Sequence, residues 1–196
     1  MDKQEGVYYH IYNRGTDKRA IFNNDRDYLR FIDGLERFRI DRRGEKLVDV
    51  ISYCLMSNHY HLLVRSMASD GVAKFMGRFA TGYTMYFNKK YDRKGVLFES
   101  GYKYRRIESA AYLLQTSRYI HLNPLSLTEP GWKTEGVRDA ALAFDSLRRY
   151  PWTSLDVYLD EGADNDLVDC ALILAMAGGR EGYAELIKGD IEALSS

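Results

Sequence analysis

The stretch from Lys46 to Arg65 constrains the fold most, because it predicts two β-strands joined by a tight turn. The segments 46–56 and 59–65 are rich in residues that favour strands, and Ser57-Asn58 separates them. Two strands joined by so short a connection pair antiparallel. A chain built around this hairpin therefore needs an antiparallel sheet and something to cover it.

The second strand of this hairpin has two chemically different faces. Alternate side chains of a strand share a face, so His59 and His61 point one way, and Tyr60, Leu62 and Val64 point the other. The apolar face predicts a core. The other face places two imidazoles on a surface or in a cleft.

The remaining signals give the order β-α-β-β-α-β-α. A strand is predicted over 6–14, a helix from Asn24 or Asp25 to about Phe38, a helix over 71–90, one or two strands over 95–107, and a helix from Ser109 to near Asn123. This order predicts an α+β fold, ferredoxin-like or RRM-like, with an antiparallel sheet covered on one face by helices. Pro124 should end the last helix.

The segment after this body differs from it in charge. Residues 152–196 carry ten acids and two bases, whereas residues 72–118 carry ten bases and three acids. We expect two parts: residues 1–127 as the body, and residues 128–196 as a loop followed by an acidic helical extension. The basic middle favours a polyanionic partner.

Cysteine content and hydropathy bear on the compartment. The two cysteines, Cys54 and Cys170, are too few for a disulfide framework, which favours a reducing, cytoplasmic setting. The N-terminus lacks the apolar segment of a secretory signal. No apolar run approaches the roughly 20 residues that span a bilayer, so we expect no membrane association.

The histidine pair carries the first candidate chemistry. Two imidazoles on one strand face, at His59 and His61, can hold one divalent cation from neighbouring positions. The alternative is a pair of exposed or hydrogen-bonded histidines without a metal. A functional site would also need a third ligand and a reacting group.

The helix over 109–123 offers both. Tyr112, Thr116, Tyr119 and Asn123 recur at helical spacing and form one stripe, with Tyr119 and Asn123 one turn apart. Tyr119 can equally be a packed aromatic with an exposed tip, and Asn123 can simply cap the helix. His121 projects from the opposite side of this helix and is not expected to join them.

Three motifs in order resemble a known family. "SNHYHLLV" resembles the histidine-hydrophobic-histidine motif of HUH nucleases, and "YHIYNRG" and "RYIHLNP" resemble transposases of single-strand insertion sequences. The nearest resemblance is to REP-associated tyrosine transposases. It covers residues 7–125, and "YPWTSLDVYL" resembles a connector in longer members.

The resemblance implies the following site. Tyr119 would be the catalytic nucleophile, and His59, His61 and Asn123 would hold Mg²⁺ or Mn²⁺, although two imidazoles suit Mn²⁺ or Zn²⁺ better than Mg²⁺. The implied activity is cleavage and strand transfer of single-stranded DNA at hairpin or palindromic repeats, through a 5′-phosphotyrosine intermediate. His10 matches a family histidine without an assigned role.

Contacts to DNA are expected from five further residues. They are Asn13, Arg14, Lys103, Arg105 and Arg106. The implied partner is single-stranded or hairpin DNA, bound by a monomer or homodimer in the bacterial cytoplasm near the nucleoid. Three alternatives remain: a sequence-specific DNA-binding protein that no longer cuts, a metal-dependent hydrolase that uses only the histidines, and an RNA-binding module.

Overall fold

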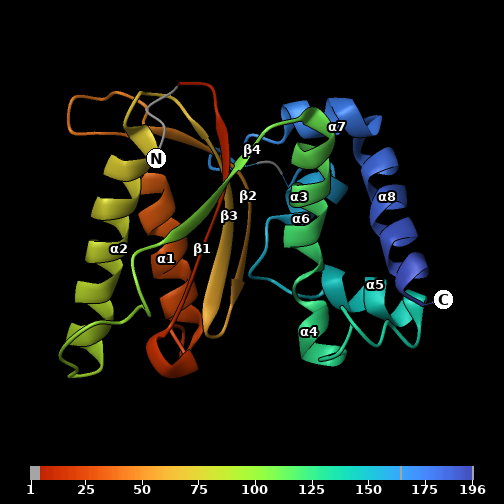
Figure 1. The fold of residues 1–196 in the computed structure, drawn as a ribbon, viewed down its shortest axis with the longest axis horizontal. Helices are drawn as coiled ribbons and strands as arrows, with labels where there is room; N and C mark the ends of the chain where they lie inside the picture. Colours follow the sequence, from red (N-terminus) through yellow and green to blue (C-terminus); the bar gives the residue numbers. More distant parts are fainter. Residues whose placement is uncertain (1–4, 164, 196) are drawn as a thin grey trace.

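The computed structural model describes residues 5–163 and 165–195, and its centre is a four-stranded antiparallel sheet (Figure 1). The strands lie in the order β2-β3-β1-β4. Their bounds are β1 Tyr8–Arg14, β2 Val48–Met56, β3 His59–Ser66 and β4 Lys103–Ile107. The predicted hairpin is confirmed, since β2 and β3 pair antiparallel with Met56 opposite His59.

Two helices cover the apolar face of the sheet. They are α1 (Asp25–Phe38) and α2 (Gly71–Lys90), and both lie on the left of the sheet in Figure 1. Phe31 of α1 packs edge-to-face on Phe79 of α2, with ring centroids 4.6 Å apart, and both are almost completely buried. Tyr60 of β3 meets Phe31 at 5.0 Å, so the apolar face of the hairpin forms the core, as predicted.

A third helix lies on the opposite face of the sheet. It is α3 (Ala110–Leu122), and Ser109 caps it by accepting a hydrogen bond from the Tyr112 amide. The predicted α+β class is confirmed, and the structure adds that helices lie on both faces (Figure 1). The histidine face also carries apolar side chains such as the fully buried Leu63, and α3 lies against β2 and β3 there.

The segment before β4 is less regular than the sequence predicts. Of residues 95–107 only Lys103–Ile107 form a strand, and Phe98 makes an isolated bridge to Gly15. Gly95, at φ +88°, turns the chain in a conformation that side chains disfavour. The sheet therefore gains one strand here.

The C-terminal segment forms five helices among the described residues. They are α4 Leu125–Thr128, α5 Ala140–Arg148, α6 Leu155–Leu159, α7 Ala171–Ala177 and α8 Gly179–Leu194. The helices α7 and α8 lie on the side of α3 that faces away from the sheet (Figure 1). The body and this extension therefore share α3 as a common layer.

Buried polar contacts join the extension to the body. The ring nitrogens of His121 hydrogen-bond Tyr183 at 2.8 Å and Ser154 at 2.9 Å. Arg118 of α3 forms an ion pair with Asp190 of α8 at 2.6 Å. His121 therefore links α3 to the extension and takes no part in the predicted site.

No helix in the described part of the chain combines the length and the apolar character that crossing a membrane requires.

Candidate active site

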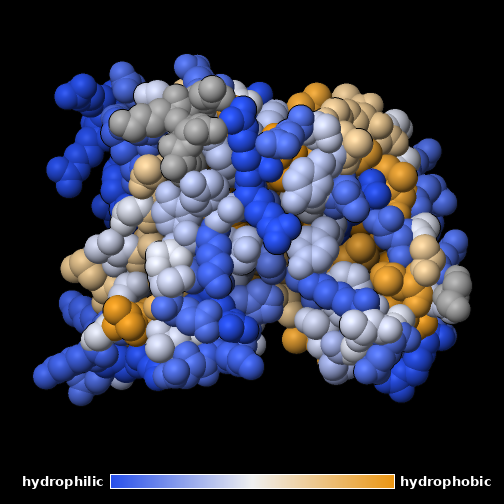
Figure 2. Space-filling view, viewed as in Figure 1, coloured by the Kyte–Doolittle hydropathy of each residue, from blue (hydrophilic) through white to orange (hydrophobic). Residues whose placement is uncertain are grey.

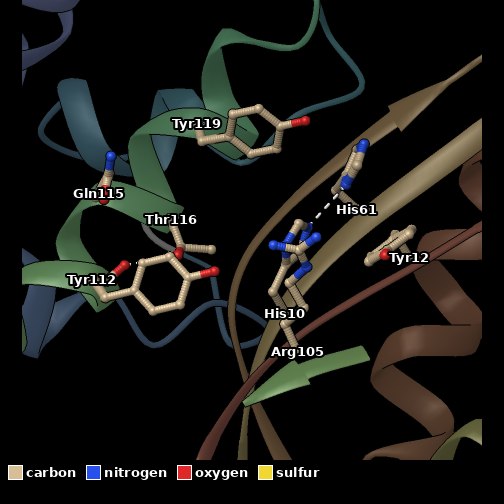
Figure 3. Close-up of a pocket in the computed structure, with 8 residues that line it drawn as sticks. All are labelled: His10, Tyr12, His61, Arg105, Tyr112, Gln115, Thr116 and Tyr119. Carbon is tan, nitrogen blue, oxygen red and sulfur yellow. Dashed lines mark hydrogen bonds between the residues drawn. The ribbon is translucent and has the colours of Figure 1, made fainter. Parts of the chain in front are cut away.

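The histidine face of the sheet and the helix α3 line a cavity of about 420 Å³ between them (Figure 3). The sheet contributes His10, Tyr12, His61 and Arg105, and α3 contributes Tyr112, Gln115, Thr116 and Tyr119. The predicted stripe of α3 therefore faces the predicted histidine face. It does so because the apolar stripe of the same helix, including Leu113 and Ile120, is buried.

Tyr119 lies directly against the histidines. Its ring centroid is 5.9 Å from that of His61 and 6.0 Å from that of His10. Figure 3 shows the tyrosine projecting from α3 towards the sheet side of the cavity. A phenol and a pair of imidazoles thus share one cleft although they are far apart in the sequence.

His10 and His61 are joined by a hydrogen bond. The His10 Nε2 and His61 Nδ1 atoms are 2.9 Å apart, and both side chains are buried. β1 and β3 are neighbours in the sheet, with Tyr12 opposite His61, so His10 lies diagonally beside His61. When His61 donates this bond, its Nε2 keeps a free lone pair.

His59 is oriented in a similar way. Its Nδ1 lies 2.7 Å from Oδ1 of Asn58, and an amide oxygen accepts hydrogen bonds only, so Nδ1 carries the proton. The free lone pair of His59 is then on Nε2. Each histidine of the pair therefore has a partner that leaves Nε2 available.

The three histidines at this site are neutral near pH 7. Burial lowers the pKa of His10 and of His59 to about 4, with a smaller effect from nearby cations. Burial also holds the pKa of His61 well below its ordinary value. Neutral imidazole is the form that binds metal ions.

The residues present fit a cation only in part. Among the described residues no group of three or more histidine, cysteine, aspartate or glutamate side chains is placed to hold a metal ion. The two imidazoles stand at 90° with centroids 5.3 Å apart, and both keep Nε2 available. A cation held by His59 and His61 needs further oxygen ligands from an amide, water or DNA.

Asn123, the expected third ligand, lies outside the cavity. It is buried, and its amide nitrogen donates to the Tyr119 carbonyl at 2.7 Å, one turn back along the helix. The amide therefore caps its own helix, which is the alternative that the sequence left open. Its oxygen is the atom that remains for a ligand role.

The five expected DNA contacts fall into different surroundings. Asn13, Arg14 and Lys103 line a second cavity of about 280 Å³ together with His59, and Arg105 lines the first cavity. Arg14 is paired with Glu99 at 2.9 Å. Hydrophilic side chains gather over β4 in Figure 2, and Lys103 and Arg105 are exposed there.

Arg106 lies apart from the other four residues, and the side chain of Asn13 is already hydrogen-bonded within the chain. The Asn13 amide donates to the Ser100 carbonyl at 3.0 Å and accepts from the Arg14 amide, so it is occupied within the chain. Arg106 points to the other face of β4, because neighbouring residues of a strand alternate. There it lines a separate cavity with Tyr8.

Lys133 is a site residue that the sequence did not indicate. It comes from the loop between α4 and α5, and its Nζ lies 2.8 Å from the Tyr119 hydroxyl. A lysine in an irregular loop carries no periodic signal, so nothing in the sequence marks it. Tyr12, from β1, was missed for a similar reason, since its place opposite His61 depends on the strand register.

Burial of His121 gives a testable pH dependence of stability. Its pKa falls from 6.5 to about 3 because it is completely buried. Between pH 6.5 and about 3 the unfolded chain binds a proton at His121 and the folded chain does not. The contribution of His121 to the free energy of unfolding is therefore complete above pH 6.5 and is lost as the pH falls towards 3. We expect His121→Gln to remove up to about 1.4 kcal/mol per pH unit from the slope of unfolding free energy between pH 6 and 5.

Urea unfolding of both proteins across this pH range measures the slope. The comparison uses the change with pH and not the absolute stability, because losing the bonds to Tyr183 and Ser154 lowers stability at every pH. An unchanged slope in the variant would mean that His121 is protonated in the folded protein.

Comparison with known proteins gives a family and a fold. The sequence model of the family described as "Transposase IS200 like" matches residues 3–123. Among curated proteins, none matches the chain. A solved structure of a REP-associated tyrosine transposase bound to a REP hairpin is similar at a TM-score of 0.53 and 12% identity, covering 88% of this chain and 93% of that one. The tRNA(His) guanylyltransferase of Saccharomyces cerevisiae reaches a TM-score of 0.41 at 14% identity, over 74% of this chain and 72% of that one.

Proposed function

The chain belongs to the family of IS200-like transposases, and from that premise we propose that it cuts and rejoins single-stranded DNA through a covalent bond to Tyr119. The observation that carries the proposal is the position of the Tyr119 ring, 5.9 Å from the ring of His61 across one cavity. A phenol is a usable nucleophile for phosphoryl transfer only when the phosphate and the groups that stabilise charge are held beside it.

The reaction is a transesterification. The Tyr119 oxygen loses its proton and attacks a phosphorus atom of the DNA strand, which forms an O–P bond and breaks the bond to the 3′ oxygen. The strand leaves with a free 3′-hydroxyl, and the 5′-phosphate stays on the tyrosine. Because one phosphodiester replaces another, the bond energy is conserved and the reverse reaction rejoins DNA.

His59 and His61 are the residues that would hold a divalent cation, Mg²⁺ or Mn²⁺, through their Nε2 atoms. When bound, such a cation neutralises developing charge on the oxygens of the reacting phosphate. His10 and Asn58 keep the two imidazoles in the required tautomers through the bonds at 2.9 and 2.7 Å. Asn123 can complete the site only through its amide oxygen, since its amide nitrogen donates to the Tyr119 carbonyl.

The path of the DNA follows from the two cavities. Both are lined by Tyr12 and His61, so they meet at these two side chains. A strand crossing this point would meet Arg105 on one side, and Arg14 and Lys103 on the other. Cations follow phosphates and rings stack on bases, which suits single-stranded DNA.

Hairpin DNA is the substrate that we propose. The structurally similar REP-associated transposase is bound to a REP hairpin, which supports a structured repeat as the partner here. Since one chain supplies both the tyrosine and the histidines, a monomer can form the whole site. A homodimer is not needed for the chemistry.

One observation favours a second function, that of a DNA-binding protein that no longer cuts. The amide nitrogen of Asn123 is used within its own helix, and the side chain does not line the cavity. Without a third protein ligand the cation affinity would be low. The two functions share the DNA-binding surface and differ in whether Tyr119 becomes linked to DNA.

Trapping the covalent adduct separates the two functions. Purified protein is incubated with a library of labelled hairpin oligonucleotides carrying single-stranded flanks and with Mg²⁺ or Mn²⁺, and is then denatured. We expect a DNA-linked protein whose modified peptide contains Tyr119. Three tyrosines line the cavity, so peptide mapping also distinguishes Tyr119 from Tyr12 and Tyr112. Hairpin binding without any adduct would support the non-cleaving alternative.

A further inference from the structure

We propose that Lys133 is a catalytic residue of this site, which donates a hydrogen bond to the reacting oxygen of Tyr119 and stabilises the negative charge on that oxygen in the transition states of attack and of rejoining. This inference rests on the proposed function of Tyr119. It also makes the C-terminal extension part of the active site, although the matched family region ends at residue 123.

The contact geometry is that of a charge-assisted hydrogen bond. The ammonium of Lys133 donates to the Tyr119 oxygen at 2.8 Å. The same Nζ lies 4.6 Å from the centroid of the Tyr119 ring, within cation–π range. Lys133 therefore contacts the one atom of Tyr119 that would react.

The loop that carries Lys133 is anchored on both sides. Trp132, the preceding residue, is buried, and Lys133 also lies 5.1 Å from the centroid of its ring. The carbonyl of Gly131 accepts bonds from the amides of Thr134 and Glu135, which closes the turn. An anchored loop holds a lysine over a fixed point better than a free one does.

The loop is further tied to the end of the chain. The amide of Val137 donates to the Leu194 carbonyl at 2.9 Å. Gly136, at φ +81°, approaches the same carbonyl so closely that a Cβ would lie 2.2 Å from it. The position of Lys133 therefore depends on the C-terminal end of α8, so the rest of the extension also contributes to the site.

The charged groups around Tyr119 are cationic. The titratable and charged side chains that face it are His10 and Tyr12 from β1, His61 from β3, Arg105 from β4, Tyr112 from α3 and Lys133 from the loop, and the cations among them are Arg105 and Lys133. In the described part of the chain no carboxylate lines this cavity. An ammonium at hydrogen-bond distance from the attacking oxygen stabilises the negative charge that this oxygen carries in the transition state.

The proposed step balances as follows. The Tyr119 oxygen bonds to phosphorus as its proton passes to water and the bond to the 3′ oxygen breaks, and the 3′ oxygen takes a proton from water. The Lys133 ammonium stabilises the charge on the Tyr119 oxygen during this step. Lys133 keeps its own proton throughout and stabilises the same oxygen when the reaction runs backwards.

The test compares Lys133→Met and Lys133→Arg with the native protein. The first readout is hairpin affinity, measured by fluorescence anisotropy. We expect Lys133→Met to lower it by less than about tenfold, since removing one cation leaves Arg14, Lys103 and Arg105 in place on the DNA-binding surface.

The second readout is the single-turnover rate of adduct formation with a saturating hairpin oligonucleotide, which we expect Lys133→Met to reduce by about a hundredfold. Lys133→Arg should restore most of this rate, because the charge and the hydrogen bond return. Lys188→Met is the matched control, since Lys188 also belongs to the extension, pairs with Glu185 and lies over an aromatic ring. It should leave the affinity and the rate unchanged.

The outcomes separate this inference from the proposed function. Equal single-turnover rates in native protein and Lys133→Met would overturn the role of Lys133, as would a loss confined to hairpin affinity. A native protein that binds hairpins but never forms an adduct would contradict the proposed function instead. Circular dichroism confirms that each variant is folded before it is compared.

Discussion

Tyr119→Phe is expected to abolish the covalent DNA adduct and to lower cleavage by at least about ten-thousandfold, because it removes only the hydroxyl group that contains the attacking oxygen. The phenyl ring remains in place beside His61, and its contact with the Lys133 ammonium through the ring face is retained. Hairpin affinity should therefore change by less than about threefold. Denaturing gels measure the adduct, and fluorescence anisotropy measures binding.

A matched variant shows whether the effect is specific to this hydroxyl. Tyr104→Phe also removes one phenol oxygen, from a residue that is 41% exposed and lies on the other face of β4 from Lys103 and Arg105. It should form the adduct at the native rate. Cleavage that survives in Tyr119→Phe would favour a hydrolase that uses only the histidines, with water as the nucleophile.

The elements were predictable because their signals are local. The helix over 71–90 was predicted with the bounds it has, since its apolar residues recur at helical spacing throughout. The last helix of the body is bounded by a capping serine and a proline, and it runs from Ala110 to Leu122 as expected. The family was predictable for the same reason, because its motifs are short and contiguous.

The pairing of the site residues was only partly predictable. Alternation along one strand and spacing along one helix placed His61 and Tyr119 on particular faces, and the fold brings these faces together. The bond between His10 and His61 was beyond reach, since it depends on the register of two strands and joins residues 51 positions apart. The hydrogen-bond partners of single side chains could not be predicted either. Asn123 bonds its own helix, which is a local option open to any asparagine at a helix end.

The contact of Lys133 with Tyr119 could not be predicted from the sequence for a different reason. The sequence predicts a boundary at residue 127 and places the candidate site residues before it. The structure packs the extension on α3 through His121 and Arg118, and the connecting loop then reaches the Tyr119 hydroxyl. Contacts made by irregular loops depend on where both ends of the loop are fixed, which no local pattern encodes.

Replacing either histidine of the pair should remove metal-dependent cleavage. We expect His59→Ala and His61→Ala each to weaken Mn²⁺ binding by more than about tenfold and to lower cleavage by about a thousandfold, since a two-imidazole site has no spare protein ligand. The loss at His61 should be the larger, because its removal also leaves His10 buried without its partner. The free Mn²⁺ signal in electron paramagnetic resonance measures binding without DNA or turnover.

His121→Gln is the control for a general loss of histidine binding. His121 is the fourth histidine, it is completely buried between Tyr183 and Ser154, and it lies on the far side of α3 from the cavity. This variant should bind Mn²⁺ like the native protein. If His59→Ala and His61→Ala also bind Mn²⁺ normally, while a chelator still stops cleavage, the cation must be held elsewhere and the histidine pair would serve only to bind DNA.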